Sequence, residues 1–275
     1  MRKMMKGYIW AMIGIMLLAL VNAAQAAAAV PMDVVLRWAP VIGQQNYSTN
    51  PVDRVNVFTR VNFDRDWRTN NNSMNIPFVN AVEPAVYYSL VESTTHYFVG
   101  YYLYYPRYEG KQEHENDMTG VLIALHKPGL GAENMAMLLS YSNGKWKRWQ
   151  ASNTLSSKKR FMISITSGSH EIEVSGASPN PGVLLFYPHG GNLYQERNYY
   201  RLVNLAELWQ RRDDIGPGHI FNRWGYFDGY YYKNTAAPWV WALNRIEWLS
   251  NPGELMQDIL HLKKTAIIYV NNEYR

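Results

Sequence analysis

Short runs of β-branched and aromatic residues, separated by turn residues, dominate the chain from about residue 34 to residue 187. In Val55–Phe63, valine and threonine take every second position, as in a strand with one buried face. Further strands are expected at Ala85–Val91, His96–Tyr105, Gly120–Leu125, Ala136–Tyr141, Arg160–Thr166, Glu171–Val174 and Val183–Tyr187. This spacing predicts a mainly β protein, an antiparallel two-sheet β-sandwich with a few short helices.

The pattern changes after about residue 200. Leucines and Trp209 recur at helical spacing, which predicts a short helix over Leu202–Arg211. A second helix is expected over Glu254–Leu262 and a closing strand over Ile267–Val270. Between them, Ile220–Trp248 is irregular and rich in tryptophan and tyrosine. These rings form either a carbohydrate platform or extra core over a sheet edge, and the large area that aromatic residues bury favours core.

The N-terminus is typical of a secretory signal peptide. Basic residues precede the apolar run Ile9–Val21, and Ala24-Gln25-Ala26 follows it with small residues at the cleavage positions. The run is shorter than the roughly 20 residues of a membrane-spanning helix, although an uncleaved anchor is the alternative. We expect cleavage after Ala26 and export to the periplasm or beyond. Residues 27–275 would then form one domain, elaborated from about residue 200 onward.

Composition and charge exclude several classes of protein. The 14% aromatic content excludes intrinsic disorder, and the absence of cysteine excludes disulfides, zinc-thiolate sites and a cysteine nucleophile. The formal charge of +5 falls to +2 without the predicted signal, because three of the 27 basic residues lie there. The densest basic cluster, Lys145–Trp149, follows a predicted hairpin turn and is interpreted as solvated lysines. Serine hydrolase, zincin, P-loop and dinucleotide motifs are missing, so neither a nucleotide nor a nucleic acid is expected as partner.

Potential ligands concentrate in Glu113–Asp117, just before the predicted strand Gly120–Leu125. Carboxylates with one imidazole suit a hard or borderline divalent ion such as Mg²⁺, Ca²⁺ or Mn²⁺. The same groups could do general acid–base work, or form a polar loop that solvates the end of a strand. The residues alone leave these three interpretations open.

Two other stretches supply secondary candidates. Asp64 and Asp66 are followed by three asparagines, but the glycine and distal glutamate of an EF-hand are missing, which favours a capped turn. His189 stands beside two glycines after the strand Val183–Tyr187, where it could approach a site closely or belong to a turn.

The segment Tyr101–Leu125 resembles the central region of the necrosis-inducing, ethylene-inducing-peptide-like cytolysins. Those proteins carry an aromatic strand ending in Y-F-P-K-D, a loop, and then G-H-R-H-D-W-E. The segment is more similar to related bacterial secreted proteins with an H-E-N-D-[LM]-E-G motif, and to vacuolar-protein-sorting-related proteins. Leu184–Gly191, Leu208–Arg212 and Ala237–Trp241 are also similar to that group.

The resemblance implies a β-sandwich with a divalent cation at one end, which helps to dock a sphingolipid glycan headgroup on a membrane. The motif histidine and aspartate fall on His114 and Asp117, but two acidic positions fall on Tyr108 and Thr119. Neighbouring glutamates could substitute, with lower affinity for a hard dication such as Mg²⁺ or Ca²⁺. The predicted metal ligands are therefore His114, Asp117, Glu109 and Glu115.

Three functions follow from these patterns. The favoured one is a secreted recognition or toxin-like protein that binds a glycan, a lipid headgroup or an envelope component. The second is a metal-assisted hydrolase that uses His114, Asp117 and His189. The third is a structural role, in which His114 and Asp117 hydrogen-bond loops at the end of the sandwich. The oligomeric state is left open. All functional versions require His114 and Asp117 to share one solvent-reachable hollow.

Overall fold

The computed structural model describes residues 31–48, 50, 54, 56–80, 82–127, 135–149, 160–175, 183–189, 198–230, 235–243 and 246–275. The predicted signal peptide and its cleavage site lie outside the described residues. Val35–Arg275 forms one compact unit, and the fold below is that of this unit.

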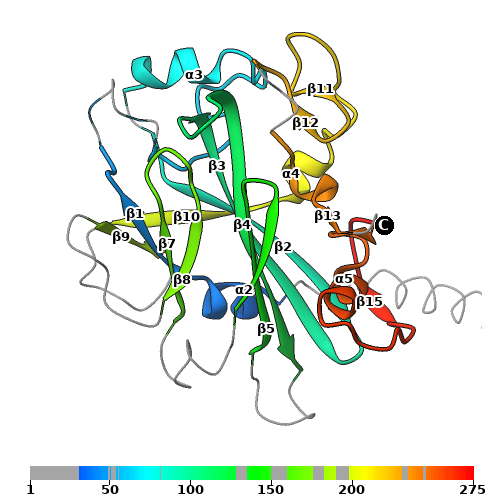
Figure 1. Ribbon diagram of the computed structural model, residues 1–275. Helices are drawn as coiled ribbons and strands as arrows, with labels where there is room; N and C mark the ends of the chain where they lie inside the picture. The colour runs from blue at the N-terminus through cyan, green and yellow to red at the C-terminus, as the bar shows by residue number, and fades with distance from the viewer. Residues whose placement is uncertain are drawn as a thin grey trace, which may run out of the picture. The chain divides into compact units, whose positions relative to one another are not determined.

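One 11-stranded sheet organises the chain, in the order β6-β5-β4-β3-β2-β10-β9-β1-β7-β8, with β15 paired to β2 (Figure 1). Its strands are β1 Val41–Gln45, β2 Ala85–Ser93, β3 His96–Tyr108, β4 His114–His126, β5 Met135–Ser142, β6 Lys145–Trp149, β7 Met162–Ile165, β8 Ile172–Ser175, β9 Val183–Pro188, β10 Tyr199–Asn204 and β15 Tyr269–Asn271. Two small ribbons pair β11 Phe221–Arg223 with β12 Tyr226–Phe227, and β13 Ala242–Leu243 with β14 Ile246–Glu247. The helices are α2 Met32–Trp38, α3 Asn72–Asn75, η2 Ile76–Phe78, α4 Ala206–Trp209, η5 Pro238–Val240 and α5 Pro252–Ile259.

The expected mainly β architecture with short helices is confirmed, but the sheet is continuous rather than split into two antiparallel sheets. Strand β10 pairs in parallel with both β2 and β9, and β1 pairs in parallel with β7. Distant strands also approach each other, because Asn143 after β5 donates from Nδ2 to Oε1 of Glu171, beside β8, at 3.0 Å. Alternation along single strands carries no information about such parallel crossovers, which explains the difference.

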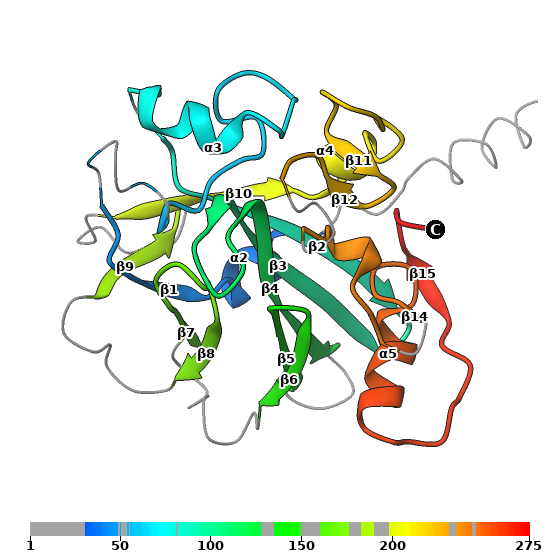
Figure 2. The same cartoon turned by 45° about the horizontal axis from the view of Figure 1, so that its top comes forward.

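Strands β3 and β4 form the long central hairpin of the sheet (Figures 1 and 2). Their register runs from His96 opposite His126 at one end to Tyr108 opposite His114 at the other. Thirteen residues at 3.3 Å each place these two ends about 40 Å apart. Both views show α3 and the β11–β12 ribbon at the Tyr108 end, and α5 with β15 at the His96 end.

Three expected elements differ from the structure. Strand β4 begins at His114, so most of the motif expected before the strand Gly120–Leu125 lies within that strand. Residues 56–63 are irregular, and Thr59 makes only an isolated bridge to Tyr104. Val57 and Phe58 are nonetheless both buried, so the segment fills core on both sides instead of alternating. The predicted helix over Leu202–Arg211 is half strand: its leading residues belong to β10, and only Ala206–Trp209 is α-helical. Parallel pairing with β2 overrides the helical spacing there.

The aromatic C-terminal region supplies core, as the buried area of its rings favours. Trp239, Trp241 and Trp248 are each at most 2% exposed. Trp241 stacks on Tyr141 of β5 with ring centroids 4.2 Å apart, so it packs on the sheet. Predicted elements at Glu254–Leu262 and Ile267–Val270 appear as α5 and β15, each shifted by about two residues. No helix among the described residues has the length and apolarity needed to cross a bilayer.

Candidate functional site

A pocket of about 330 Å³ opens beside the start of β4, at the Tyr108 end of the central hairpin. His114 and Asp117 both line this pocket, as a functional reading of the motif requires. The other lining residues are Tyr108, Lys111, Gln112, Met118, Tyr141, Asn143, Gly144, Tyr226, Ala236 and Val240. The motif thus meets groups from the β3–β4 loop, the β5–β6 turn and the aromatic C-terminal region.

Asn116 fixes the local path of β4 between the two motif residues. Its φ of +59° lies in the left-handed region, which asparagine tolerates better than most residues. Its Nδ2 donates to the carbonyl oxygens of Thr69 at 3.1 Å and Asp228 at 2.7 Å, and its Oδ1 accepts a hydrogen bond from the Tyr104 hydroxyl. The asparagine is fully buried, so the motif position between His114 and Asp117 is structural.

His114 is held by a hydrogen bond and a ring stack. Its Nδ1 lies 2.9 Å from the carbonyl oxygen of Asn116, so Nδ1 carries a proton and donates to that oxygen. The Tyr108 ring stacks on it, with centroids 4.5 Å apart and planes within 6°. Burial, followed by the Asp117 charge, raises the pKa of Tyr108, which keeps the phenol neutral at physiological pH. The ring of His114 is therefore held in a fixed orientation in the pocket wall.

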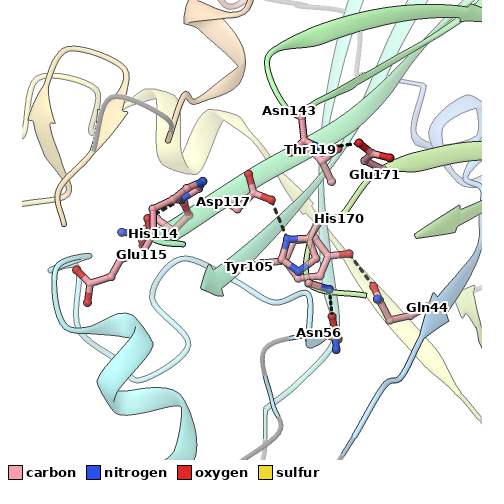
Figure 3. A network of polar contacts seen from close by, with 12 residues as sticks. Gln44, Asn56, Tyr105, His114, Glu115, Asp117, Thr119, Asn143, His170 and Glu171 are labelled. Atoms are coloured by element: carbon pink, nitrogen blue, oxygen red, sulfur yellow. Dashed lines mark hydrogen bonds and ion pairs between the residues drawn. The ribbon is translucent and has the colours of Figure 1, made fainter. Parts of the chain in front are cut away.

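Asp117 is joined to a histidine that its sequence position does not reveal. Its Oδ2 accepts a hydrogen bond at 2.7 Å from Nδ1 of His170, which lies in the β7–β8 turn (Figure 3). His170 is fully buried and stacks on Tyr105 with ring centroids 3.6 Å apart. Its Nε2 is buried and has no hydrogen-bond partner among the described residues. One carboxylate oxygen of Asp117 is therefore engaged away from the pocket.

The two glutamates of the predicted metal set lie elsewhere. Glu115 accepts hydrogen bonds from the Ser73 hydroxyl of α3 and from the backbone N–H of Tyr230. Figure 3 shows its side chain directed away from Asp117. Glu109 is exposed, and its Oε1 lies 3.4 Å from the guanidinium of Arg107. Neither glutamate lines the pocket.

The secondary candidates do not join the pocket either. Asp64 accepts hydrogen bonds from the backbone of Asp66 at 3.0 Å and from Nδ2 of Asn75 at 2.6 Å. Asp66 pairs with Arg68, and the Arg68 side-chain hydrogen bond is the main cause that lowers its pKa to about 2. These contacts agree with the capped-turn interpretation. His189 is exposed after β9, and its neighbouring glycines lie outside the described residues.

The donor set does not fit a resident divalent cation. Among the residues that the structure describes, no three His, Asp or Glu side chains are gathered as metal ligands. The resemblance places acids at two positions that here hold other groups: the Tyr108 ring stacks on His114, and the Thr119 hydroxyl donates to the carbonyl of Tyr141 at 2.6 Å. The cation stays a prediction of the sequence, and the function proposed below does not depend on it.

Sequence reasoning missed the tyrosines that complete the pocket. Tyr141 and Tyr226 come from β5 and β12, and burial is the main cause that raises the pKa of Tyr141 to about 12. The turn at Asn143-Gly144 was predicted only as a hairpin turn, but both of its residues also line the pocket. Tyrosine abundance was visible in the sequence, but only the packing of the C-terminal region on the sheet shows which rings face the hollow.

No family model and no curated protein matches the chain. Three of the solved structures similar to it are entitled "Toxin fold for microbial attack and plant defense" (14% identity, TM-score 0.37, covering 63% of this chain and 74% of that chain), "NLPPya in complex with glucosamine" (15%, 0.30, 44% and 50%) and "Crystal structure of Necrosis and Ethylene inducing Protein 2 from the causal agent of cocoa's Witches Broom disease" (13%, 0.29, 44% and 51%). One of these titles names a necrosis and ethylene inducing protein, the group that the segment Tyr101–Leu125 resembles. The matched region spans about half the length of the last two structures. The function proposed for this chain therefore rests on its own pocket.

Proposed function

We propose that the chain is an exported recognition protein whose pocket at His114 and Asp117 binds a glycan. The observation that carries the proposal is the convergence of tyrosine rings and hydrogen-bonding groups on one open hollow of about 330 Å³. Sugars present C–H groups on their faces and hydroxyls on their edges. A site for them therefore needs flat apolar surfaces beside fixed donors and acceptors, and this pocket offers both.

The aromatic walls are held rigidly from behind. Tyr108 stacks on His114 and Tyr141 stacks on Trp241, in both cases with nearly parallel planes. The guanidinium of Arg223 lies 4.0 Å from the centre of the Tyr226 ring. Rings that are already packed lose little conformational entropy when a ligand covers them, so binding energy is retained.

Polar groups around the rings suit hydroxyls. Asp117 keeps acceptor capacity after its bond to His170, because a carboxylate can accept about four hydrogen bonds. The amides of Gln112 and Asn143 and the ammonium of Lys111 belong to the same lining. The neutral phenol of Tyr108 can donate as well as accept. This mixture favours a neutral sugar or an amino sugar over a polyanion, since the pocket carries both signs of charge.

The lining favours binding over glycoside hydrolysis. Glycosidases of both stereochemical classes generally use two carboxyl groups across the scissile bond. Among the described residues that line this pocket, Asp117 is the only acid, and its histidine partner His170 is sealed from solvent. A hydrolytic role would require a second acid that the lining does not provide.

The test compares glycan binding by the mature protein and three variants. Tyr226→Leu removes an aromatic wall, and Gln112→Ala removes an amide at an exposed position. Trp224→Leu is the matched control, because Trp224 is 38% exposed in the β11–β12 turn and does not line the pocket. We expect saturable binding on a glycan array and by calorimetry, at least tenfold weaker for Tyr226→Leu and unchanged for the control.

Two further measurements distinguish a soluble sugar from a lipid headgroup and test the structural alternative. Free glucosamine and mannose are compared with vesicles carrying a glycosylated lipid, which distinguishes a soluble sugar from a headgroup. Absence of binding to every glycan and vesicle, with all variants correctly folded, would overturn the proposal. It would leave the structural role of His114 and Asp117.

A further inference from the structure

A second hollow lies at the opposite end of the β3–β4 hairpin from the candidate glycan pocket. It has a volume of about 420 Å³ and is enclosed by the β2–β3 turn, β4, β5, α5 and the segment 262–268. The distance between the two ends of the hairpin, about 40 Å, makes this a separate site. It is also the larger of the two pockets described here.

The interior of this hollow is apolar. Phe98, Met137 and Met256 are each 5% exposed and line it, together with Ala124. None of the described lining residues is Asp, Glu, Lys or Arg. Cavities with such linings gain free energy from apolar ligands and would be penalised for burying a charge. An aliphatic chain is chemically compatible with this apolar interior, whereas a sugar is not.

The rim carries polar side chains, and most of the hydrogen bonds described for them are formed within the protein. Gln257 of α5 and Thr265 exchange two hydrogen bonds of 3.1 Å, one through the threonine hydroxyl and one through its N–H. Thr95 and Nδ1 of His96 lie 2.8 Å apart. These bonds hold the mouth in place without requiring polar groups from a ligand inside the hollow.

Two exposed apolar residues of the lining lie close in sequence to two lysines. Leu262 and Ile268 line the hollow although they are 56% and 66% exposed, which leaves much apolar surface in water. Lys263 and Lys264 follow Leu262 directly and are exposed, and Lys264 also contacts Asp258 at 3.0 Å. An apolar tail entering past Leu262 would therefore leave its head beside cationic groups.

We propose that this hollow binds the chain of a long-chain fatty acid, with the carboxylate at Lys263 and Lys264. The tail covers the exposed parts of Leu262 and Ile268 and contacts the apolar interior. Two features together favour this occupant: a lining without Asp, Glu, Lys or Arg, and two exposed lysines that directly follow the lining residue Leu262. This site is separate from the glycan pocket, so the failure of one proposal would not affect the other.

Binding is measured with a polyene fatty acid whose fluorescence rises when it leaves water, and confirmed by calorimetry with palmitate. We expect saturable one-to-one binding to the mature protein. Ala266→Trp fills the mouth from an exposed lining position and should weaken binding at least tenfold. Met74→Trp, at a 62% exposed residue of α3 remote from the lining, should leave it unchanged.

The charge contribution is tested separately. The double variant Lys263→Glu and Lys264→Glu should weaken palmitate binding several-fold but leave hexadecanol binding unchanged. Ile268→Asp provides a second block if Ala266→Trp lowers the melting temperature. Non-saturable binding, or equal binding by the mature protein and both blocking variants, overturns the proposal. Equal loss of palmitate and hexadecanol in the double variant overturns the placement of the carboxylate.

Discussion

Asp117 and His170 form a buried carboxylate–imidazole pair, with Oδ2 accepting a hydrogen bond of 2.7 Å from Nδ1. The pair joins β4 to the β7–β8 turn, two segments that are 53 residues apart. It lies directly behind the candidate glycan pocket, because Asp117 also lines that pocket. One side chain therefore has both a structural contact and a position for ligand binding.

Removing the carboxylate should expose the structural part of this role. Asp117→Ala leaves the N–H of fully buried His170 without an acceptor, which should lower the free energy of unfolding by about 1–3 kcal/mol. Asp117→Asn keeps a carbonyl acceptor and should cost less. Urea unfolding of both variants measures the difference. Equal stability of Asp117→Ala and the parent would show that the pair contributes nothing.

Asn116 should be more sensitive to substitution than other left-handed asparagines. Asn116→Ala removes three buried hydrogen bonds and places alanine at φ +59°, for an expected loss of about 3–5 kcal/mol. Asn143→Ala is the matched control, because Asn143 has φ +50° but is exposed in a hairpin turn. It should cost about 1–2 kcal/mol. Comparable losses in denaturant titrations would contradict the structural importance of the Asn116 contacts.

The sequence pattern predicted local structure better than it predicted pairing. The strands at Ala85–Val91, His96–Tyr105 and Ala136–Tyr141 and the hairpin turn at Asn143-Gly144 were predicted close to their observed positions, because alternation and turn chemistry are local signals. Strand β4 begins six residues before the predicted Gly120, because polar motif residues also take part in its pairing with β3. The parallel pairing of β10 with β2 was not predicted. A pairing of only four residues does not change the helical or alternating pattern of hydrophobic positions along the chain.

The candidate site was predicted only in part for the same physical reason. His114 and Asp117 share a pocket, as the motif required. The partner of Asp117 is His170, which has no recognisable spacing from the motif and becomes visible only when the β7–β8 turn packs beside β4. The cation ligand set remains a prediction: Glu109 and Glu115, chosen for proximity in sequence, have their own partners in the fold.

His96 should make stability depend on pH. Partial burial, followed by the nearby charge of His126, lowers the pKa of His96 below its ordinary 6.5. The unfolded state then binds more protons than the folded state, so stability rises with pH. As the pH falls below about 6.5, His96 should destabilise the protein until its lowered folded pKa is passed. His96→Gln should show a smaller decrease in melting temperature between pH 7 and pH 5 than the parent. An identical decrease would exclude this contribution.

Divalent ions should have little effect on the protein. A ligand that binds only the folded state stabilises it according to its concentration relative to its Kd. Because His114 and Asp117 lack further carboxylate ligands in the described residues, millimolar Ca²⁺ or Mg²⁺ should not raise the melting temperature, and chelation should not lower it. A calcium-dependent rise that Asp117→Asn abolishes would instead establish the cation predicted from the sequence.

Gly120, which follows the motif on β4, should be required for packing rather than for backbone freedom. A Cβ atom there would lie 2.6 Å from the carbonyl oxygen of Tyr101 and 2.9 Å from the Tyr102 ring, and backbone atoms cannot yield easily. Gly120→Ala should therefore cost about 1–3 kcal/mol, as overpacking does in well-filled cores.

Gly144→Ala separates the two effects, because its φ is +71° and nothing lies within 4 Å of an added Cβ. That control should cost about 1–2 kcal/mol, the penalty of a left-handed alanine. In addition, only Gly120→Ala should alter the near-ultraviolet circular dichroism, since the added methyl group displaces the Tyr102 ring that packs against Trp241. An unchanged aromatic spectrum with full stability in Gly120→Ala would show that β4 and the C-terminal rings are less tightly packed than these distances require.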